Sequence, residues 1–174
     1  MIVFRLLFLI TFFMTHQGFS QKKGESILRI RQDFRTINTD STLKVIVMDA
    51  EDFLENAPDG GGELRGFYKK GNLVKVTVWI GLSLGNSVRE FYLKDGEVFF
   101  VYEKFDSFVQ TGEVPDKSRV VTSFEGRYYI LKNKIIEEKL SGKIPLDKTR
   151  ATISLLKEDV EEYRMKLSAH PDNS

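Results

Sequence analysis

The residues of this chain that could do chemistry are carboxylates and arginines near one another on predicted strands. Glu90, Glu103 and Glu125 lie in or beside strand-like segments, close to Arg89 and Arg127. A glycosidase needs two carboxyl groups held about 5 to 9.5 Å apart, one with a raised pKa. The same residue types are also common cross-strand partners on a solvated face, where each pair contributes little. An envelope hydrolase is therefore the alternative, and a non-catalytic protein is the main hypothesis.

Most other catalytic groups are missing from the sequence. It has no cysteine and two histidines, His16 in the first twenty residues and His170 in the C-terminal tail. Zinc sites of Cys and His, cysteine nucleophiles and Ser-His-Asp triads are therefore excluded. The glycine patterns of phosphate-binding and dinucleotide-binding loops do not occur either, so we predict no cofactor.

An acidic segment between Asp49 and Glu63 raises the question of a metal ion. Calcium takes carboxylate oxygens as ligands. Phe53, however, occupies the fifth position counted from Asp49, where the calcium-loop pattern requires a ligand. We interpret the segment as a solvated loop and predict no metal site.

Aromatic residues on predicted strands are the candidates for ligand contact. Tyr68, Trp79, Tyr92 and Tyr129 alternate with aliphatic residues that can already form a core, and Arg127 lies close to Tyr129 in sequence. Aromatic side chains with arginine give contact area at low entropic cost. Packing beneath a helix is the alternative role for the aromatics. These five residues are the predicted binding residues.

The segments that carry them predict an antiparallel meander. Glu63 to Lys104 is typical of four strands, because Lys70-Gly71-Asn72 and Lys94-Asp95-Gly96 are hairpin signals between β-branched and aromatic runs. Alternation places Val98, Phe100 and Tyr102 on one face. The remaining predicted segments are strands at Leu43 to Met48, Val120 to Lys132 and Lys134 to Leu140, a loop at Asp106 to Ser118, and a bend at Glu125-Gly126.

Two amphipathic helices are predicted to cover this sheet. In Glu25 to Asn38, apolar residues recur with a helical period, and Arg31 and Arg35 lie between them. A second periodic segment runs from about Lys148 to Leu167, with Asp147 as the expected N-cap. The fold class is therefore α+β, an antiparallel β-meander of about seven strands with an N-terminal and a C-terminal helix.

The first twenty residues predict export. One basic residue, Arg5, precedes the apolar run Leu6 to Met14, and Gly18-Phe19-Ser20 provides small residues for cleavage. We expect a signal peptide at 1–20, one α+β domain at 21–169 and a disordered tail at 170–174. The protein is then periplasmic or secreted, with no stable membrane anchor after cleavage.

Charge gives no reason to expect nucleic acid as a partner. The whole chain has 26 basic and 25 acidic residues, and removal of Arg5 with the first twenty residues leaves equal numbers, so the net charge is zero. The partner we expect is a protein or another envelope ligand. A carrier for an apolar ligand, bound between sheet and helices, is a further alternative.

Three hairpins share an aromatic pair followed by a turn residue and an aliphatic residue. They begin at Phe67, Phe91 and Tyr128, at unequal spacing. This pattern resembles the hairpin repeats of the MORN and YwqK-like families. The whole layout, with GGGELRGFYKKG (60–71) and FVYEKFDSF (100–108), resembles uncharacterised exported β-meander proteins of Bacteroidota-type bacteria, from which no function carries over. Our prediction is an exported, non-catalytic binding or interaction module.

Overall fold

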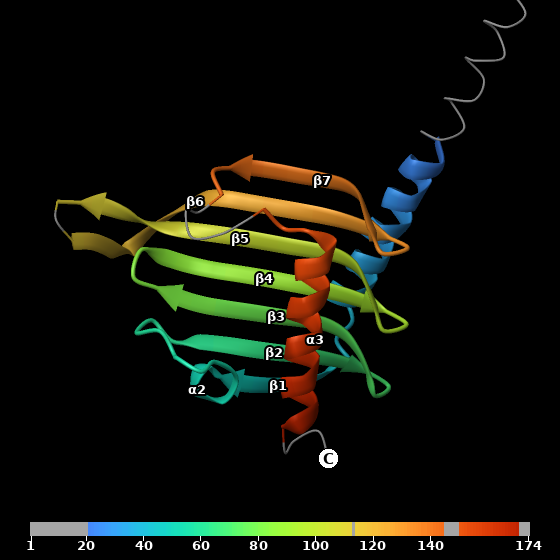
Figure 1. The fold of residues 1–174 in the computed structure, drawn as a ribbon, viewed down its shortest axis with the longest axis horizontal. Helices are drawn as coiled ribbons and strands as arrows, with labels where there is room; N and C mark the ends of the chain where they lie inside the picture. Colours follow the sequence, from blue (N-terminus) through green and yellow to red (C-terminus); the bar gives the residue numbers. More distant parts are fainter. Residues whose placement is uncertain (1–20, 113, 145–149, 171–174) are drawn as a thin grey trace, which may run out of the picture.

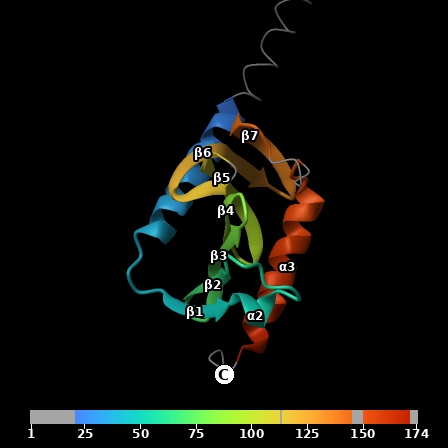
Figure 2. The ribbon, with the colours of Figure 1, turned by 90° about the vertical axis from the view of Figure 1, so that its left-hand side faces the viewer.

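The fold is a seven-stranded antiparallel sheet between two helices. The computed structural model describes residues 21–112, 114–144 and 150–170. Residues 21–38 form the N-terminal helix on one face, and α3 (Ile153–Ala169) crosses the other face (Figures 1 and 2). The predicted α+β meander with a helix at each end is confirmed. The predicted signal peptide at 1–20, the predicted cap Asp147 and tail residues 171–174 lie outside the described residues.

The strands follow one another across the sheet in chain order, each antiparallel to the next. A four-residue helix, α2 (Ala50–Phe53), follows the first strand. No helix among the described residues is long and apolar enough to cross a membrane. The strands are β1 (Lys44–Asp49), β2 (Gly62–Lys69), β3 (Asn72–Leu82), β4 (Gly85–Lys94), β5 (Glu97–Thr111), β6 (Val114–Leu131) and β7 (Lys134–Gly142).

Two-residue turns close the hairpins at one end of the sheet. Asp95 and Gly96 have φ values of 53° and 81°, and the pair Lys70-Gly71 has 51° and 81°. Positive φ at both central positions matches the right-handed twist of the flanking strands. The β6–β7 turn has the same geometry at Lys132-Asn133. Each turn sets the pairing of the residues next to it, and one extra residue in the second strand, Val74, Phe99 or Ile136, then shifts the register.

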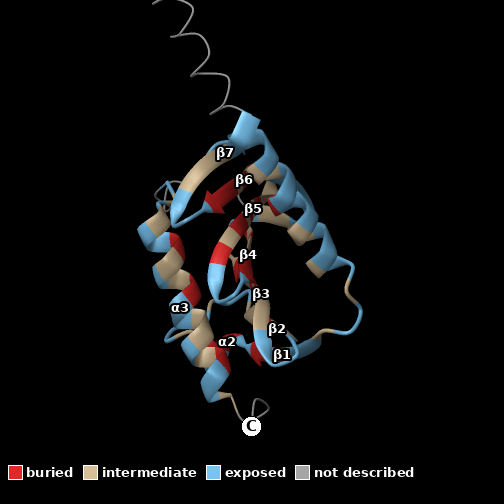
Figure 3. Cartoon of the chain, turned by 90° about the vertical axis from the view of Figure 1, so that its right-hand side faces the viewer, coloured by how far each residue is buried: buried red, intermediate tan, exposed pale blue. Residues whose placement is uncertain are grey.

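The larger core lies between α3 and the sheet. Leu156, Val160 and Leu167 of α3 are buried there against strand residues that alternate with those of the opposite face. Figure 3 shows the buried residues on the sheet and on the inner side of α3. The buried strand residues of this core are Ile46, Met48, Leu64, Val76, Val78, Phe91, Leu93, Val98, Val101, Tyr128 and Ile130.

A smaller core lies beneath the N-terminal helix. The predicted apolar stripe of this helix packs on Tyr92, Phe100 and Tyr129. The ring of Phe34 lies 4.8 Å from the ring of Tyr92 and 5.2 Å from that of Phe100, measured between centroids. Aromatic pairs at such distances add stability beyond the area that they bury.

The predicted loop at Asp106 to Ser118 is wrong. Its described residues extend β5 and β6 into a long hairpin, in which Gln110 pairs with Pro115 and Thr111 with Val114. The hairpin runs past the ends of β4 and β7, and Val114 is 72% exposed. Apolar alternation is weak in a segment that faces solvent on both sides, so the segment does not look like a strand in sequence.

Two predictions of strand geometry are also corrected. Val98 does not share a face with Phe100, because Phe99 is an extra residue opposite β4, and Val98 faces α3 instead. The bend at Glu125-Gly126 is absent, because Gly126 pairs regularly with Glu103. The irregularities in the pairing of β6 with β5 lie at Ser123 and at 117–119.

The C-terminal helix begins later than predicted. Residues 150–152 are not helical, and α3 starts at Ile153. Thr152 is the N-cap, and its hydroxyl oxygen accepts a 3.3 Å hydrogen bond from the backbone N–H of Leu155. Thr152 therefore satisfies one of the donors that a helix start leaves unpaired.

Candidate functional site

Cross-strand register brings four of the five predicted binding residues to one face. Trp79, Tyr92, Arg127 and Tyr129 all point to the side of the N-terminal helix, whereas Tyr68 packs with the core beneath α3. Tyr92 and Tyr129 are buried there, so their role is packing beneath a helix, the alternative to ligand contact. Trp79 and Arg127 remain partly exposed.

The N-terminal helix lies mainly along one cross-strand row of this face. Moving across the sheet, its residues contact Glu137 on β7, Tyr129 on β6, Phe100 on β5, Tyr92 on β4 and Lys75 on β3. These contacts lie near the end of the sheet that holds the β2–β3, β4–β5 and β6–β7 turns (Figure 1). The rows beyond this one are left without a helix.

We call these uncovered rows the open face. Each of its side chains is exposed or partly exposed. The row next to the helix is Val47, Arg65, Thr77, Glu90, Tyr102 and Arg127, and the following row is Glu63, Trp79, Val88, Lys104 and Glu125.

Four charged residues of the open face form two ion pairs with one another. Arg65 Nε lies 2.5 Å from Glu63 Oε1, and Arg127 Nη2 lies 2.5 Å from Glu125 Oε1. The apolar members are Val47, which is 45% exposed, and the half-buried Val88, Trp79 and Tyr102. The open face therefore carries both apolar and charged side chains.

Glu90 links the open face to the helix-covered row. It accepts a 2.5 Å hydrogen bond from the hydroxyl of Tyr92 and lies 3.2 Å from Lys75 Nζ. Burial, reinforced by Glu90, raises the pKa of Tyr92 far above its ordinary value, so the hydroxyl keeps its proton. Asn38 of the helix also donates to the Tyr92 hydroxyl, at 3.0 Å. This network fixes the position of Tyr92.

Tyr102 lies between two carboxylates of the open face. It pairs across β4 with Glu90 and across β6 with Arg127, whose guanidinium carbon is 5.4 Å from the Tyr102 ring centroid. Burial and a hydrogen bond to Glu125 raise the pKa of Tyr102 to about 12. Its hydroxyl is thus a neutral hydrogen-bond donor at physiological pH.

The structure separates the three candidate catalytic carboxylates. Glu90 and Glu125 lie on the open face, whereas Glu103 is buried on the opposite face, beneath α3. Glu103 accepts a 2.5 Å hydrogen bond from Tyr128 and lies 3.4 Å from Arg89. A pair of catalytic carboxyl groups that includes Glu103 is therefore not formed.

The glycine-rich segment at 60–62 turns tightly beside Trp79. A Cβ atom on Gly60 would lie 2.5 Å from the carbonyl oxygen of Gly81, and one on Gly61 would lie 4.0 Å from the indole ring. Gly81 also donates a 2.9 Å hydrogen bond to the carbonyl of Gly61. Glycine is required where two backbones approach this closely, so the segment forms one wall beside Trp79.

Two cavities flank the N-terminal helix. The larger, about 400 Å³, lies between the C-terminal half of the helix and the β2–β3 and β4–β5 turns. The smaller, about 150 Å³, lies between the helix, the start of β5 and the end of β6. The smaller cavity is lined by Arg31, Phe34, Arg35, Phe100, Arg127 and Tyr129.

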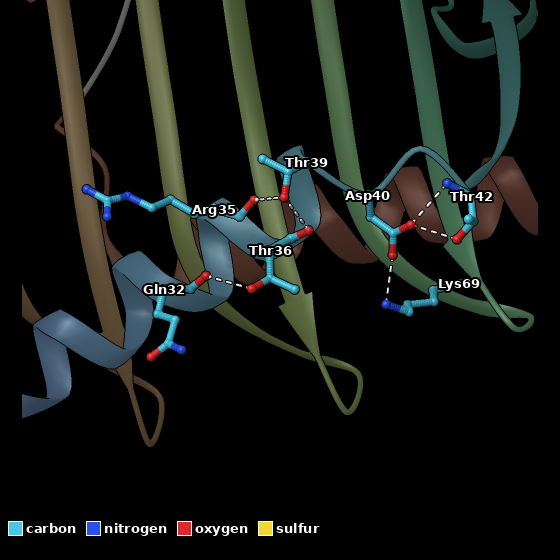
Figure 4. Close-up of polar contacts among 7 residues, drawn as sticks. All are labelled: Gln32, Arg35, Thr36, Thr39, Asp40, Thr42 and Lys69. Atoms are coloured by element: carbon cyan, nitrogen blue, oxygen red, sulfur yellow. Dashed lines mark hydrogen bonds and ion pairs between the residues drawn. The ribbon is translucent and has the colours of Figure 1, made fainter.

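A cap at the end of the helix borders the larger cavity (Figure 4). Asp40 accepts hydrogen bonds from the Thr42 backbone N–H at 3.0 Å and from the Thr42 hydroxyl at 2.6 Å. Lys69, which lines the cavity, lies 2.7 Å from the same carboxyl. The hydrogen bond from Lys69, followed by those from Thr42, holds the pKa of Asp40 well below its usual range.

Sequence reasoning missed two functional candidates, Arg31 and Arg35. Their positions predict only the solvated side of an amphipathic helix. The signal that distinguishes them is their spacing of four residues, which places both arginines on one side of the helix, beside the partly buried Phe34, where like charges repel.

Among the described residues, no group of three or more Asp, Glu or His side chains is placed to hold a metal ion. Comparison with family models, with curated proteins and with solved structures finds no match to this chain. Its function is therefore argued from its own geometry.

Proposed function

We propose that this chain is an exported, non-catalytic binding module, and that the open face is its binding surface. The observation that carries the proposal is the position of the N-terminal helix, which covers one row of the face and leaves two rows beside it. A sheet commonly packs one or both of its faces against helices. Because this face is only half covered and carries aromatic and aliphatic side chains, it is available to a partner.

The composition of the open face supports binding over catalysis. Val47, Val88 and Trp79 offer apolar contact, and paired charges around them offer hydrogen bonds that fix orientation. This mixture, with an aromatic and an arginine, is typical of interfaces. The ligand is an envelope protein or another envelope molecule, reached after removal of residues 1–20.

The proposal is tested by capturing molecules from a periplasmic or secreted fraction on the immobilised protein. The capture must then be shown to depend on the open face. The variant Val47→Lys places a charge on the exposed side of β1. Its matched control is Met165→Lys, because Met165 is 64% exposed on α3, on the other side of the sheet. The proposal expects V47K to lose the captured molecule and M165K to retain it. Equal capture by both variants, or no capture by the wild-type protein, contradicts it.

An apolar-ligand carrier is the second candidate, favoured by the 400 Å³ cavity. Its lining includes Ile37, Leu73, Val74, Leu93 and Phe99. Drug-sized ligands occupy cavities of about 300 to 1,000 Å³. A fluorescent fatty acid added to the protein tests this role, because binding that is abolished by Val74→Lys favours the carrier. Absence of saturable binding removes it.

A further inference from the structure

The smaller cavity beside the N-terminal helix combines three arginines with an aromatic floor. Arg31 and Arg35 come from one side of the helix and Arg127 from β6, while Phe34, Phe100 and Tyr129 form the remaining walls. None of its lining residues in the described part of the chain is acidic. The cavity is therefore positive at its rim and apolar at its base.

Two of these arginines have no carboxylate bound to them among the described residues. The Arg31 side chain donates a 3.4 Å hydrogen bond to the Tyr129 hydroxyl, and its guanidinium carbon lies 5.6 Å from that ring. The Arg35 guanidinium has no hydrogen bond or ion pair within the described part of the chain. Figure 4 shows the Arg35 side chain extending away from the contacts at the helix end.

The charges around the cavity leave it positive. Arg127 is paired with Glu125, and Glu137 lies 2.7 Å from Lys23 while also interacting with Arg31 and Lys139. Arg31 and Arg35 are four residues apart on one helix, where like charges destabilise each other. An anion between them would relieve this repulsion and supply the missing hydrogen-bond acceptors.

We propose that this cavity binds an oxyanion, a carboxylate or a phosphate group, which is the head of the ligand held by the open face. Arginine presents a planar fork of donors that matches two oxygens of such a group. Phe100 and Tyr129 would contact the atoms that carry it. A cavity of about 150 Å³ is smaller than a drug-sized site, so it accepts a head group. Arg127 belongs to both surfaces and makes them continuous.

Titration with inorganic phosphate and with benzoate, at constant ionic strength, tests the inference. Isothermal calorimetry of the wild-type protein is expected to show saturable binding of at least one anion. Arg35→Gln is expected to weaken it by about tenfold or more, because a charged hydrogen bond is lost. The control is Arg29→Gln, since Arg29 is exposed on the same helix and does not line the cavity.

The two anions distinguish the possible head groups. Tighter binding of phosphate identifies a phosphate ester, and tighter binding of benzoate identifies a carboxylate on an apolar group. No saturable binding of either anion, or equal weakening by R29Q and R35Q, overturns the inference. The inference rests on the proposed function only for the ligand's body. If neither anion binds but V47K still loses the captured molecule, only the inference is overturned. If an anion binds but V47K retains the captured molecule, only the proposed function is overturned.

Discussion

The Tyr128 hydroxyl donates a 2.5 Å hydrogen bond to the Glu103 carboxylate in the interior beneath α3. Arg89 lies 3.4 Å from the same carboxylate and also pairs with Asp159 of α3. Burial, followed by Glu103, raises the pKa of Tyr128, so it remains a donor at every physiological pH. This chain of contacts ties α3 to β4, β5 and β6.

Removing the Tyr128 hydroxyl is therefore expected to destabilise the protein. Tyr128→Phe leaves a buried carboxylate with one donor fewer, which costs about 1.5 to 3 kcal/mol in the free energy of unfolding. Tyr129→Phe is the control, because among the described residues its hydroxyl accepts only a 3.4 Å hydrogen bond from Arg31, and it should cost less than about 1 kcal/mol. Urea unfolding of both variants measures the difference, and equal losses would contradict the role of Glu103.

A larger residue at Gly126 tests how tightly the same cluster is packed. A Cβ atom there would lie 3.0 Å from Glu103 Cγ and 3.1 Å from the ring of Tyr128. Gly126→Ala is expected to lower the free energy of unfolding by about 1 to 3 kcal/mol through overpacking. Gly24→Ala, in the N-terminal helix with open space around it, should be neutral or stabilising by up to about 1 kcal/mol. Thermal unfolding that ranks the two variants in the opposite order would refute this account of Gly126.

The attachment of the N-terminal helix depends on Phe34. Phe34→Ala removes a ring that packs on Tyr92 and Phe100, and is expected to cost about 2 to 4 kcal/mol. Amide exchange in residues 21–38 should accelerate in this variant. Leu28→Ala should change stability by less than about 0.5 kcal/mol, because Leu28 is 63% exposed. Unchanged exchange in F34A would mean that other contacts hold the helix.

The contact of Asp40 with Lys69 predicts an acid-dependent stability. Its hydrogen bonds, from Lys69 first, lower the folded-state pKa below the ordinary value of 3.8. A lowered carboxyl pKa stabilises the fold above the unfolded value, and that stability is lost as pH falls through the folded value. Asp40→Asn should therefore lose less stability than the wild type between about pH 5 and pH 2. Asp52→Asn changes the net charge equally and should follow the wild-type curve. Identical curves for all three would contradict this assignment.

Much of the sheet could be predicted because its signals are local. The Asp95-Gly96 turn requires positive φ at both positions, and that requirement sets the pairing of Lys94 with Glu97 and of Leu93 with Val98. The extra residue Phe99 carries no comparable signal, so the faces of Val98 and Phe100 could not be separated. The β5–β6 extension was missed since its valines face solvent, and Pro115 is a residue expected in loops.

The candidate site was predicted in part. Strand alternation with correct turns places Trp79, Tyr92 and Tyr129 on one side of the sheet. Which of them are buried depends on where the N-terminal helix crosses, and that is decided by its contacts with Tyr92 and Phe100, far away in sequence. The arginine cavity depends on the same crossing, so Arg31 and Arg35 could not be assigned to it beforehand.

Trp79 provides the most direct measurement of the open face, because the chain contains a single tryptophan. The protein labelled with 5-fluorotryptophan gives one ¹⁹F NMR resonance, which reports on the middle of this face. Addition of the envelope fraction that contains the captured molecule is expected to shift or broaden the resonance in the wild-type protein and to leave it unchanged in V47K. An unchanged resonance in the wild type, while the molecule is still captured, would contradict the open face as the binding surface.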